Sequence, residues 1–226
     1  QHHQNNMGAF GGPDIITDGL VFAVDAGSTR SYAGSGTTAY NLVANNDVSL
    51  INGLGWQSGN GGYFSSDGTD DGMTTPDATN LDLVDFTLEG WVWWDQHKDY
   101  GSFLVKGPGG SGNLFNYSFF GYAANVSFGF GDGSNYRAIY ISSPAINEWH
   151  HIVGTYDGST LKFYLNSTLA ASTSITATPN QNNDALQILQ SQYSIDGRIG
   201  CAKVYNKALT AAEVLQNYNA QKNRFI

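Results

Sequence analysis

A strand, a tight turn and a second strand are encoded by WHHIVGTYDGSTLKFYL at residues 149–165. The loop Asp157-Gly158-Ser159 joins two runs rich in β-branched and aromatic residues, which is typical of a β-hairpin. Alternation with a period of two places one set of side chains inward and the other outward. In the second run Leu161, Phe163 and Leu165 alternate with Thr160, Lys162 and Tyr164. The hairpin therefore predicts an antiparallel sheet.

A second stretch, FTLEGWVWW at residues 86–94, shows the same alternation. One face carries Phe86, Leu88, Gly90, Val92 and Trp94, and the other carries Thr87, Glu89, Trp91 and Trp93. Further short runs bounded by Gly- and Asn-rich turns predict strands at 19–25, 48–51, 63–64, 103–105, 114–120, 125–130, 136–141, 186–189 and 199–205. So many short strands indicate an all-β protein.

One helix is predicted near the end of the chain. Thr210-Ala211-Ala212-Glu213 is a capping box, in which the Thr hydroxyl and the Glu carboxylate each accept from a backbone N–H of the first turn. Leu209 and Val214 flank it as a hydrophobic staple. We expect Val214, Leu215 and Tyr218 to form the buried stripe, and the helix to end within residues 219–223.

Length and composition fit one β-sandwich. The chain has 226 residues, with 28 Gly for turns and 13 Tyr, 12 Phe and 5 Trp for strands. We therefore expect residues 14–226 to form a two-sheet antiparallel jelly-roll sandwich with one short C-terminal helix. Residues 1–13 are rich in polar residues, Gly and Pro, and we expect a flexible arm or linker there.

Charge argues against two classes of partner. The formal net charge is −9, and only ten Lys and Arg are present, well dispersed along the chain. Nucleic-acid binding needs clustered cations, and an anionic membrane surface attracts them, so neither partner is expected. The single cysteine, Cys201, lies in an apolar run and is interpreted as a buried hydrophobic residue.

Three segments together resemble the laminin-G-like, concanavalin A-like lectin and glucanase superfamily. They are residues 61–71 leading into 86–92, residues 148–166 (EWHHIVGTYDG followed by LKFYLN), and residues 196–214 (DGRIG through VYNKALTAAEV). This resemblance implies a jelly roll with a carbohydrate-binding-type fold.

A narrower resemblance rests on residues 12–21, 25–32 and 215–222, which are similar to modules in virion proteins of tailed phages, notably marine ones. It implies a virion structural, decoration or fibre module at the particle surface. Its partners would be other virion proteins, copies of itself, or host and environmental glycans. The alternative is a secreted bacterial carbohydrate-binding module of a larger extracellular protein.

The sequence assigns no catalytic residue. Retaining glycoside hydrolysis needs two carboxylates about 5–5.5 Å apart, and a Glu-x-Asp-x-x-Glu pattern that would place them on one strand face is missing. The three Glu residues stand apart, at Glu89, Glu148 and Glu213. His150 and His151 are adjacent in a strand and point to opposite faces, so we expect one in the core and one in solvent. A non-catalytic protein is expected.

Candidate glycan-binding residues are aromatic, because the C–H face of a sugar stacks on a ring while polar groups at the rim bind its hydroxyls. Glu89, Trp91 and Trp93 share a strand face, with Trp93 favoured over Trp91. Trp56, Tyr136 and Tyr140 lie in or near loops and edges. The alternative is that these aromatic residues fill the core.

Calcium is the one cofactor considered. Asp67, Asp70 and Asp71 in an Asp-rich turn, together with Asp25, offer the oxygen ligands that Ca²⁺ prefers. The alternative is ordinary turn chemistry, in which Asp caps its own backbone. The resemblance implies an acidic calcium-associated pair after a Gly-x-Ile segment, but here Gly200-Cys201 occupies that place.

Overall fold

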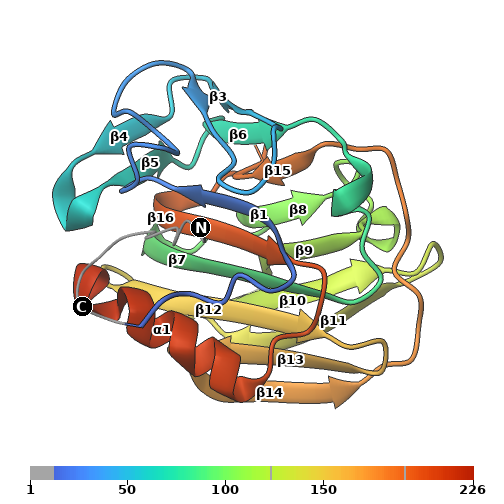
Figure 1. Ribbon diagram of the computed structural model, residues 1–226. Helices are drawn as coiled ribbons and strands as arrows, with labels where there is room; N and C mark the ends of the chain where they lie inside the picture. The colour runs from blue at the N-terminus through green and yellow to red at the C-terminus, as the bar shows by residue number, and fades with distance from the viewer. Residues whose placement is uncertain (1–12, 123, 191) are drawn as a thin grey trace, which may run out of the picture.

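The computed structural model describes residues 13–122, 124–190 and 192–226, and within them two antiparallel eight-stranded sheets pack face to face (Figure 1). Sheet A follows the order β14 (Thr168–Ser174), β13 (Thr160–Leu165), β12 (Trp149–Tyr156), β7 (Phe86–Gln96), β16 (Asp196–Tyr205), β5 (Tyr63–Asp67) and β4 (Gly55–Gln57), with β1 (Leu20–Asp25) also paired to β16. Sheet B follows the order β11 (Tyr136–Ser142), β10 (Asn125–Gly131), β9 (Tyr117–Tyr122), β8 (Ser102–Lys106), β15 (Leu186–Ile188), β6 (Gly72–Thr75), β3 (Val48–Ile51) and β2 (Thr38–Ala39). The all-β sandwich with one C-terminal helix is confirmed.

The predicted strands form with some shifted bounds, and four further strands were not predicted. The run predicted from residue 114 begins as a strand only at Tyr117, because Gly112–Leu114 forms the short 3-10 helix η3. Two more such turns, η1 (Gly59–Gly61) and η2 (Thr79–Leu81), lie in loops. The sequence did not predict β2, β4, β6 and β14. Edge strand β14 was missed because its sequence, TLAASTS, is mostly exposed and lacks an apolar face.

The main core lies between the two sheets. The predicted inner face of β7 contributes Phe86, Leu88, Val92 and Trp94 to this core. Gly90 completes the face, and a Cβ added there would meet the Phe103 ring at 2.1 Å, so the close approach of the sheets requires glycine at this position.

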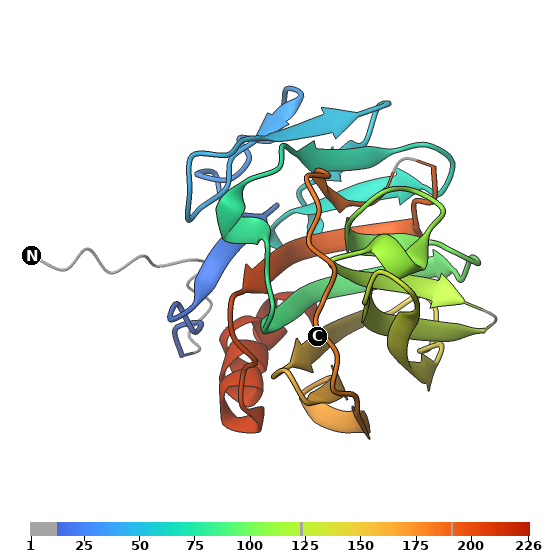
Figure 2. The same cartoon turned by 90° about the vertical axis from the view of Figure 1, so that its right-hand side faces the viewer.

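A second hydrophobic layer lies outside sheet A, beneath helix α1 (Ala211–Phe225). Figure 2 shows α1 on one side of sheet A and sheet B on the other. The capping box is confirmed, since the backbone N–H of Glu213 donates to Oγ1 of Thr210 at 3.2 Å and the Thr210 N–H donates to Oε2 of Glu213 at 2.8 Å. Leu215 is 47% exposed, so the prediction that it belongs to the buried stripe is wrong.

The helix also continues to Phe225, beyond the predicted end, because Phe225 and Tyr218 both pack on Trp91 of β7. The predicted arm at residues 1–13 lies outside the described residues, apart from exposed Pro13. No helix in the described part of the chain has the length and apolar character required to cross a membrane.

Candidate functional site

Helix α1 covers the face of β7 on which the sequence predicted a glycan site. Glu89 and Trp91 are both 0% exposed. The Trp91 ring stacks on Phe225 at 4.6 Å and on Tyr218 at 5.6 Å between ring centroids. Neither residue can contact a ligand at the surface, and the prediction for both is corrected: this face is an interior layer.

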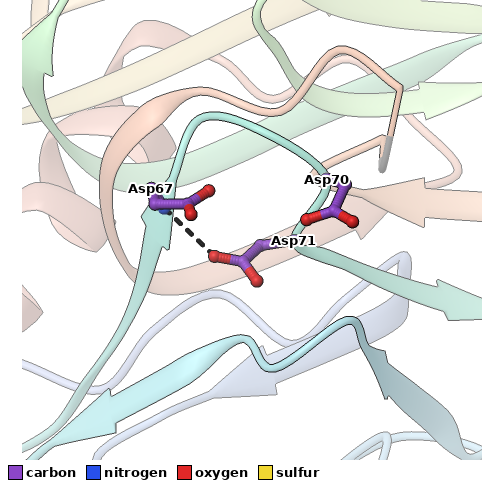
Figure 3. Close-up of side chains that lie close together, drawn as sticks. All are labelled: Asp67, Asp70 and Asp71. Atoms are coloured by element: carbon purple, nitrogen blue, oxygen red, sulfur yellow. Dashed lines mark hydrogen bonds between the residues drawn. The ribbon is translucent and has the colours of Figure 1, made fainter.

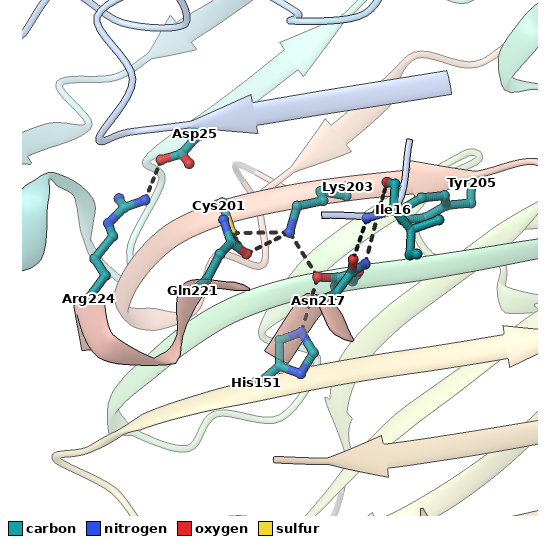
Figure 4. A network of polar contacts seen from close by, with 10 residues as sticks. Ile16, Asp25, His151, Cys201, Lys203, Tyr205, Asn217, Gln221 and Arg224 are labelled. Carbon is teal, nitrogen blue, oxygen red and sulfur yellow. Dashed lines mark hydrogen bonds and ion pairs between the residues drawn. The ribbon is translucent and has the colours of Figure 1, made fainter. Parts of the chain in front are cut away.

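Glu89 lies in a polar network under α1. Its partners His151, Lys203 and Asn217 are labelled in Figure 4. Its Oε1 lies 2.8 Å from Nζ of Lys203 and 3.0 Å from Nε2 of His151, and its Oε2 accepts from Asn217 at 2.6 Å. Lys203 also donates to Oε1 of Gln221 at 2.8 Å. Each oxygen of the buried carboxylate therefore has a partner, which is the condition for retaining a charge in an interior.

The pKa values of this network follow from burial and pairing. Burial alone would raise the pKa of Glu89, but Lys203 and the His151 hydrogen bond outweigh it and lower that pKa to about 2. Burial lowers the pKa of His151 despite its hydrogen bond to Glu89, which favours a neutral imidazole donating from Nε2. His150 is also buried, so the prediction that one histidine of the pair faces solvent is wrong.

The two other predicted tryptophans are engaged by their own neighbours. The Arg198 guanidinium lies over the half-buried Trp93 ring, 4.4 Å from its centroid, and Nε1 of Trp93 donates to Asp95 at 2.9 Å. Trp56 packs against the main core and donates from Nε1 to the Ala26 carbonyl at 2.9 Å. Both indole N–H groups thus have partners within the fold, and a glycan-binding role for these two half-buried residues stays a prediction.

Three of the four candidate calcium ligands gather in the turn between β5 and β6 (Figure 3). One carboxylate oxygen from each of Asp67, Asp70 and Asp71 lies within 4.8 Å of the others. Burial, followed by repulsion from its two neighbours, raises the pKa of Asp71 even though its Oδ2 accepts from the Asp67 N–H at 3.0 Å. Carboxylate oxygens are ligands that Ca²⁺ prefers, so calcium held by these residues stays a prediction. The turn-chemistry alternative has its own support, since Oδ1 of Asp67 accepts from the Thr69 N–H at 2.8 Å.

Asp25 does not belong to this acidic cluster. It is buried, and its Oδ1 lies 2.5 Å from Nη1 of Arg224 in α1. The prediction that Asp25 is a calcium ligand is therefore corrected, because its charge is already paired with a buried guanidinium.

The outer face of sheet B carries a hollowed aromatic surface that α1 leaves open. The first hollow has a volume of about 360 Å³ and is lined by Tyr100, Ser102, Gly110, Gly112, Phe115, Phe120, Gln190 and Tyr193. The second has a volume of about 600 Å³ and is lined by Tyr100, Gly112, Asn113, Phe120, Tyr122, Ser134, Asn135, Tyr136 and Tyr140. Because Tyr100, Gly112 and Phe120 line both, we call the two hollows together the aromatic groove.

Tyr136 crosses the floor of this groove. It enters from β11, yet its hydroxyl lies 2.9 Å from Oγ of Ser118 on β9 and 3.0 Å from Oγ of Ser127 on β10. Gly129 lies opposite Ser118 in the sheet, and a Cβ added there would meet the Arg137 carbonyl oxygen at 2.1 Å. Burial raises the pKa of Tyr136. The ring is thus fixed by its hydroxyl and presents a rigid platform.

Exposed tyrosines continue this platform. Tyr100 is 50% exposed and Tyr140 is 45% exposed, and Tyr122 lies between them with ring centroids 5.7 Å from Tyr100 and 6.4 Å from Tyr140. Tyr136 and Tyr140 were predicted from the sequence, whereas Tyr100, Phe120, Tyr122 and Tyr193 were not. The outward alternation Ser118, Phe120, Tyr122 in β9 was a signal that could have located part of the groove.

A family model described as the concanavalin A-like lectin/glucanases superfamily matches residues 67–215, more than half of the chain. The chain belongs to this superfamily. A search of the curated proteins found no match to this chain.

Solved structures similar to this superfamily member are larger and distant in sequence. The receptor binding domain of botulinum neurotoxin C/D mosaic serotype has a TM-score of 0.73 at 14% identity, covering 91% of this chain and 52% of that one. The binding domain of Paraclostridial Mosquitocidal Protein 1 has a TM-score of 0.69 at 17% identity, covering 89% and 52%. Trypanosoma rangeli sialidase has a TM-score of 0.67 at 16% identity, covering 93% and 34%. At these identities the similarity shows the fold alone.

Proposed function

We propose that this protein is a non-catalytic carbohydrate-binding module and that the aromatic groove on sheet B is its binding site. The observation that carries the proposal is the groove itself, in which exposed tyrosines surround a platform fixed by Tyr136. Sugar C–H faces stack on such rings, and small-molecule sites commonly occupy about 300–1,000 Å³, a range that includes both hollows.

Polar side chains in the lining of the groove complete this chemistry. Asn113 and Asn135 line the second hollow, and Gln190 lines the first. Amide groups donate and accept hydrogen bonds at once, as vicinal sugar hydroxyls require. Aromatic faces with amide partners nearby are suited to hydroxyl-rich ligands.

Support for a non-catalytic role comes from where the carboxylates lie. None of the described residues that line the groove is Asp, Glu or His. Glu89 is paired under α1, and Glu213 caps that helix. An acid and base couple for glycosidic cleavage would have to lie beside the ligand, within hydrogen-bond reach of the scissile bond.

We further propose that the module is displayed on a virion, as a decoration or fibre component. The resemblance of residues 12–21, 25–32 and 215–222 to tailed-phage modules supports this setting. Proteomics of purified particles, in which the chain is expected at a fixed copy number, tests it. If the chain is found only as a segment of a larger secreted bacterial protein, the alternative of a secreted carbohydrate-binding module is favoured.

The binding proposal is tested by screening immobilised glycans with the protein and two matched variants. Tyr140→Ala removes an exposed groove tyrosine, whereas Tyr40→Ala removes an equally exposed tyrosine that lines neither hollow. We expect the wild type and Tyr40→Ala to bind the same glycans without releasing reducing ends, and Tyr140→Ala to lose most of the signal. Equal binding by all three proteins contradicts the assigned site, and turnover of a bound glycan contradicts the non-catalytic role.

A further inference from the structure

We infer that the aromatic groove selects uncharged oligosaccharides of more than one ring and discriminates against sialylated and other acidic glycans. This inference rests on the proposed function and narrows its ligand class. Four observations carry it: the composition of the lining, the pairing of the neighbouring Arg137, the net charge of the chain, and the wall that the two hollows share.

The lining is entirely uncharged among the described residues. It consists of tyrosine, phenylalanine, glycine, serine, asparagine and glutamine, with no Lys, Arg or His to pair with an anion. Moving a carboxylate from water to an aromatic surface without a cation is costly, because the hydration it loses is not replaced. A neutral sugar loses only hydroxyl hydration, which amide and serine groups can replace.

A charged residue adjacent in sequence to the lining, Arg137, is already paired within the chain. Arg137 follows Tyr136 in β11, and its Nε lies 2.6 Å from Oδ2 of Asp132. Backbone N–H groups of Asn135 and Ser134, together with Arg137, lower the pKa of Asp132 to about 2, so this carboxylate stays ionised. The guanidinium therefore already has a carboxylate partner within the chain, and a ligand carboxylate would have to compete with Asp132 for it.

The net charge of the whole chain acts in the same direction. A formal charge of −9 produces a negative potential, which lowers the local concentration of anionic ligands at moderate salt. Neutral glycans do not experience this repulsion. Charge thus disfavours acidic glycans both at a distance and in contact.

The shape of the groove sets a minimum ligand length. Tyr100 and Phe120 form a wall common to both hollows, with ring centroids 6.4 Å apart. Tyr193 lies on one side of Tyr100 at 6.0 Å, and Tyr122 on the other at 5.7 Å. Successive rings of this kind offer successive stacking positions, so a ligand that crosses the shared wall gains contacts that a monosaccharide cannot make.

The test compares neutral and acidic probes directly by isothermal titration. The neutral probes are lacto-N-neotetraose, mannohexaose and laminarihexaose, and the acidic probes are sialylated lacto-N-neotetraose and an alginate hexamer. We expect at least one neutral probe to bind roughly tenfold or more tightly than either acidic one. Equal or tighter binding of an acidic probe overturns the inference and leaves the proposed function standing, whereas failure of every probe overturns both.

Two further measurements separate the effect of charge in the groove from the effect of oligosaccharide length on affinity. Asn135→Lys places a cation at the rim of the second hollow, and Asn223→Lys adds the same charge on an exposed position of α1. We expect only Asn135→Lys to raise the affinity for sialylated relative to neutral tetrasaccharide, by several-fold. For the neutral probe that binds best, affinity is expected to rise from one ring to four; a plateau at the monosaccharide contradicts a ligand that spans both hollows.

Discussion

Nζ of Lys203 lies 2.8 Å from Oε1 of Glu89, and both side chains are almost completely shielded from solvent beneath α1. The pair lies on the face of β7 that the sequence marks as half polar and half aromatic. Because helix α1 covers this face, sheet A has interior layers on both sides. The open sheet surface that carries hollows is on sheet B, and this explains why the aromatic groove is found there.

Breaking this pair is expected to cost stability. Glu89→Gln leaves the Lys203 ammonium buried without a counter-charge, which typically lowers the free energy of unfolding by about 3–5 kcal/mol. Urea denaturation measures the loss. The control Glu148→Gln changes a carboxylate that is 60% exposed and should lie within about 0.5 kcal/mol of the wild type. A Glu89→Gln protein as stable as the wild type would refute the structural role of the pair.

The Glu89–Lys203 pair also predicts that the stability of the fold falls at acid pH. The pKa of Glu89 is lowered from 4.5 to about 2 in the folded protein, so its stabilising contribution is fully present above pH 4.5 and is lost as the pH falls toward about 2. The shift corresponds to roughly 3 kcal/mol. Thermal unfolding across this window should show a steeper loss in the wild type than in Glu89→Gln. Parallel curves for the two proteins would contradict the lowered pKa.

Tyr136→Phe should weaken ligand binding without removing the ring. The substitution deletes the hydroxyl that contacts Ser118 and Ser127 and leaves those two groups without that partner, at a cost of about 1–3 kcal/mol of stability. Without these hydrogen bonds the aromatic ring at position 136 is held less rigidly, so the affinity for the best neutral glycan should fall several-fold. The ring itself remains, so the enthalpy of stacking should be retained. An unchanged dissociation constant would show that the fixed ring is not needed for binding.

The acidic cluster predicts that removing one of its negative charges stabilises the fold. The pKa of Asp71 is raised, so ionisation of this group destabilises the fold as the pH rises above its unfolded value. Asp71→Asn should therefore raise Tm by roughly 1–3 °C at neutral pH, given that 1 kcal/mol shifts Tm by about 2–4 °C at this size.

Calcium binding at the cluster remains a prediction and is tested with the same pair of proteins. Calcium added to the wild type should raise Tm by neutralising Asp67, Asp70 and Asp71, and should raise that of Asp71→Asn much less. Equal shifts in both proteins, or none in the wild type, would exclude calcium at this turn.

Much of the fold followed from local patterns in the sequence. The 149–165 hairpin and the Thr210 capping box were predictable, because turn chemistry, strand alternation and helix caps act over a few residues. The edge strand β14 was not, since most of its residues are exposed and only the small residue Ala171 is packed against the core. Its formation depends on pairing with β13, which is information outside the segment itself.

The candidate site was harder to predict for a related reason. Alternation shows that Glu89 and Trp91 share a face of β7, but it does not show that a helix formed about 120 residues later covers that face. Conversely, Tyr100 and Tyr193 are far apart in sequence, and their rings meet only because β8, β9 and β15 are neighbours in sheet B. Such sites depend on tertiary contacts that no local pattern encodes.

The most direct test of a sugar site on sheet B is backbone amide NMR during titration with the best neutral oligosaccharide. We expect the chemical-shift changes to concentrate at Tyr100, Phe120, Tyr122, Tyr136 and Tyr140. The amides of Trp93 and Arg198 on sheet A should stay unperturbed. Changes centred on Trp93, with the groove amides unmoved, would contradict a sugar site on sheet B.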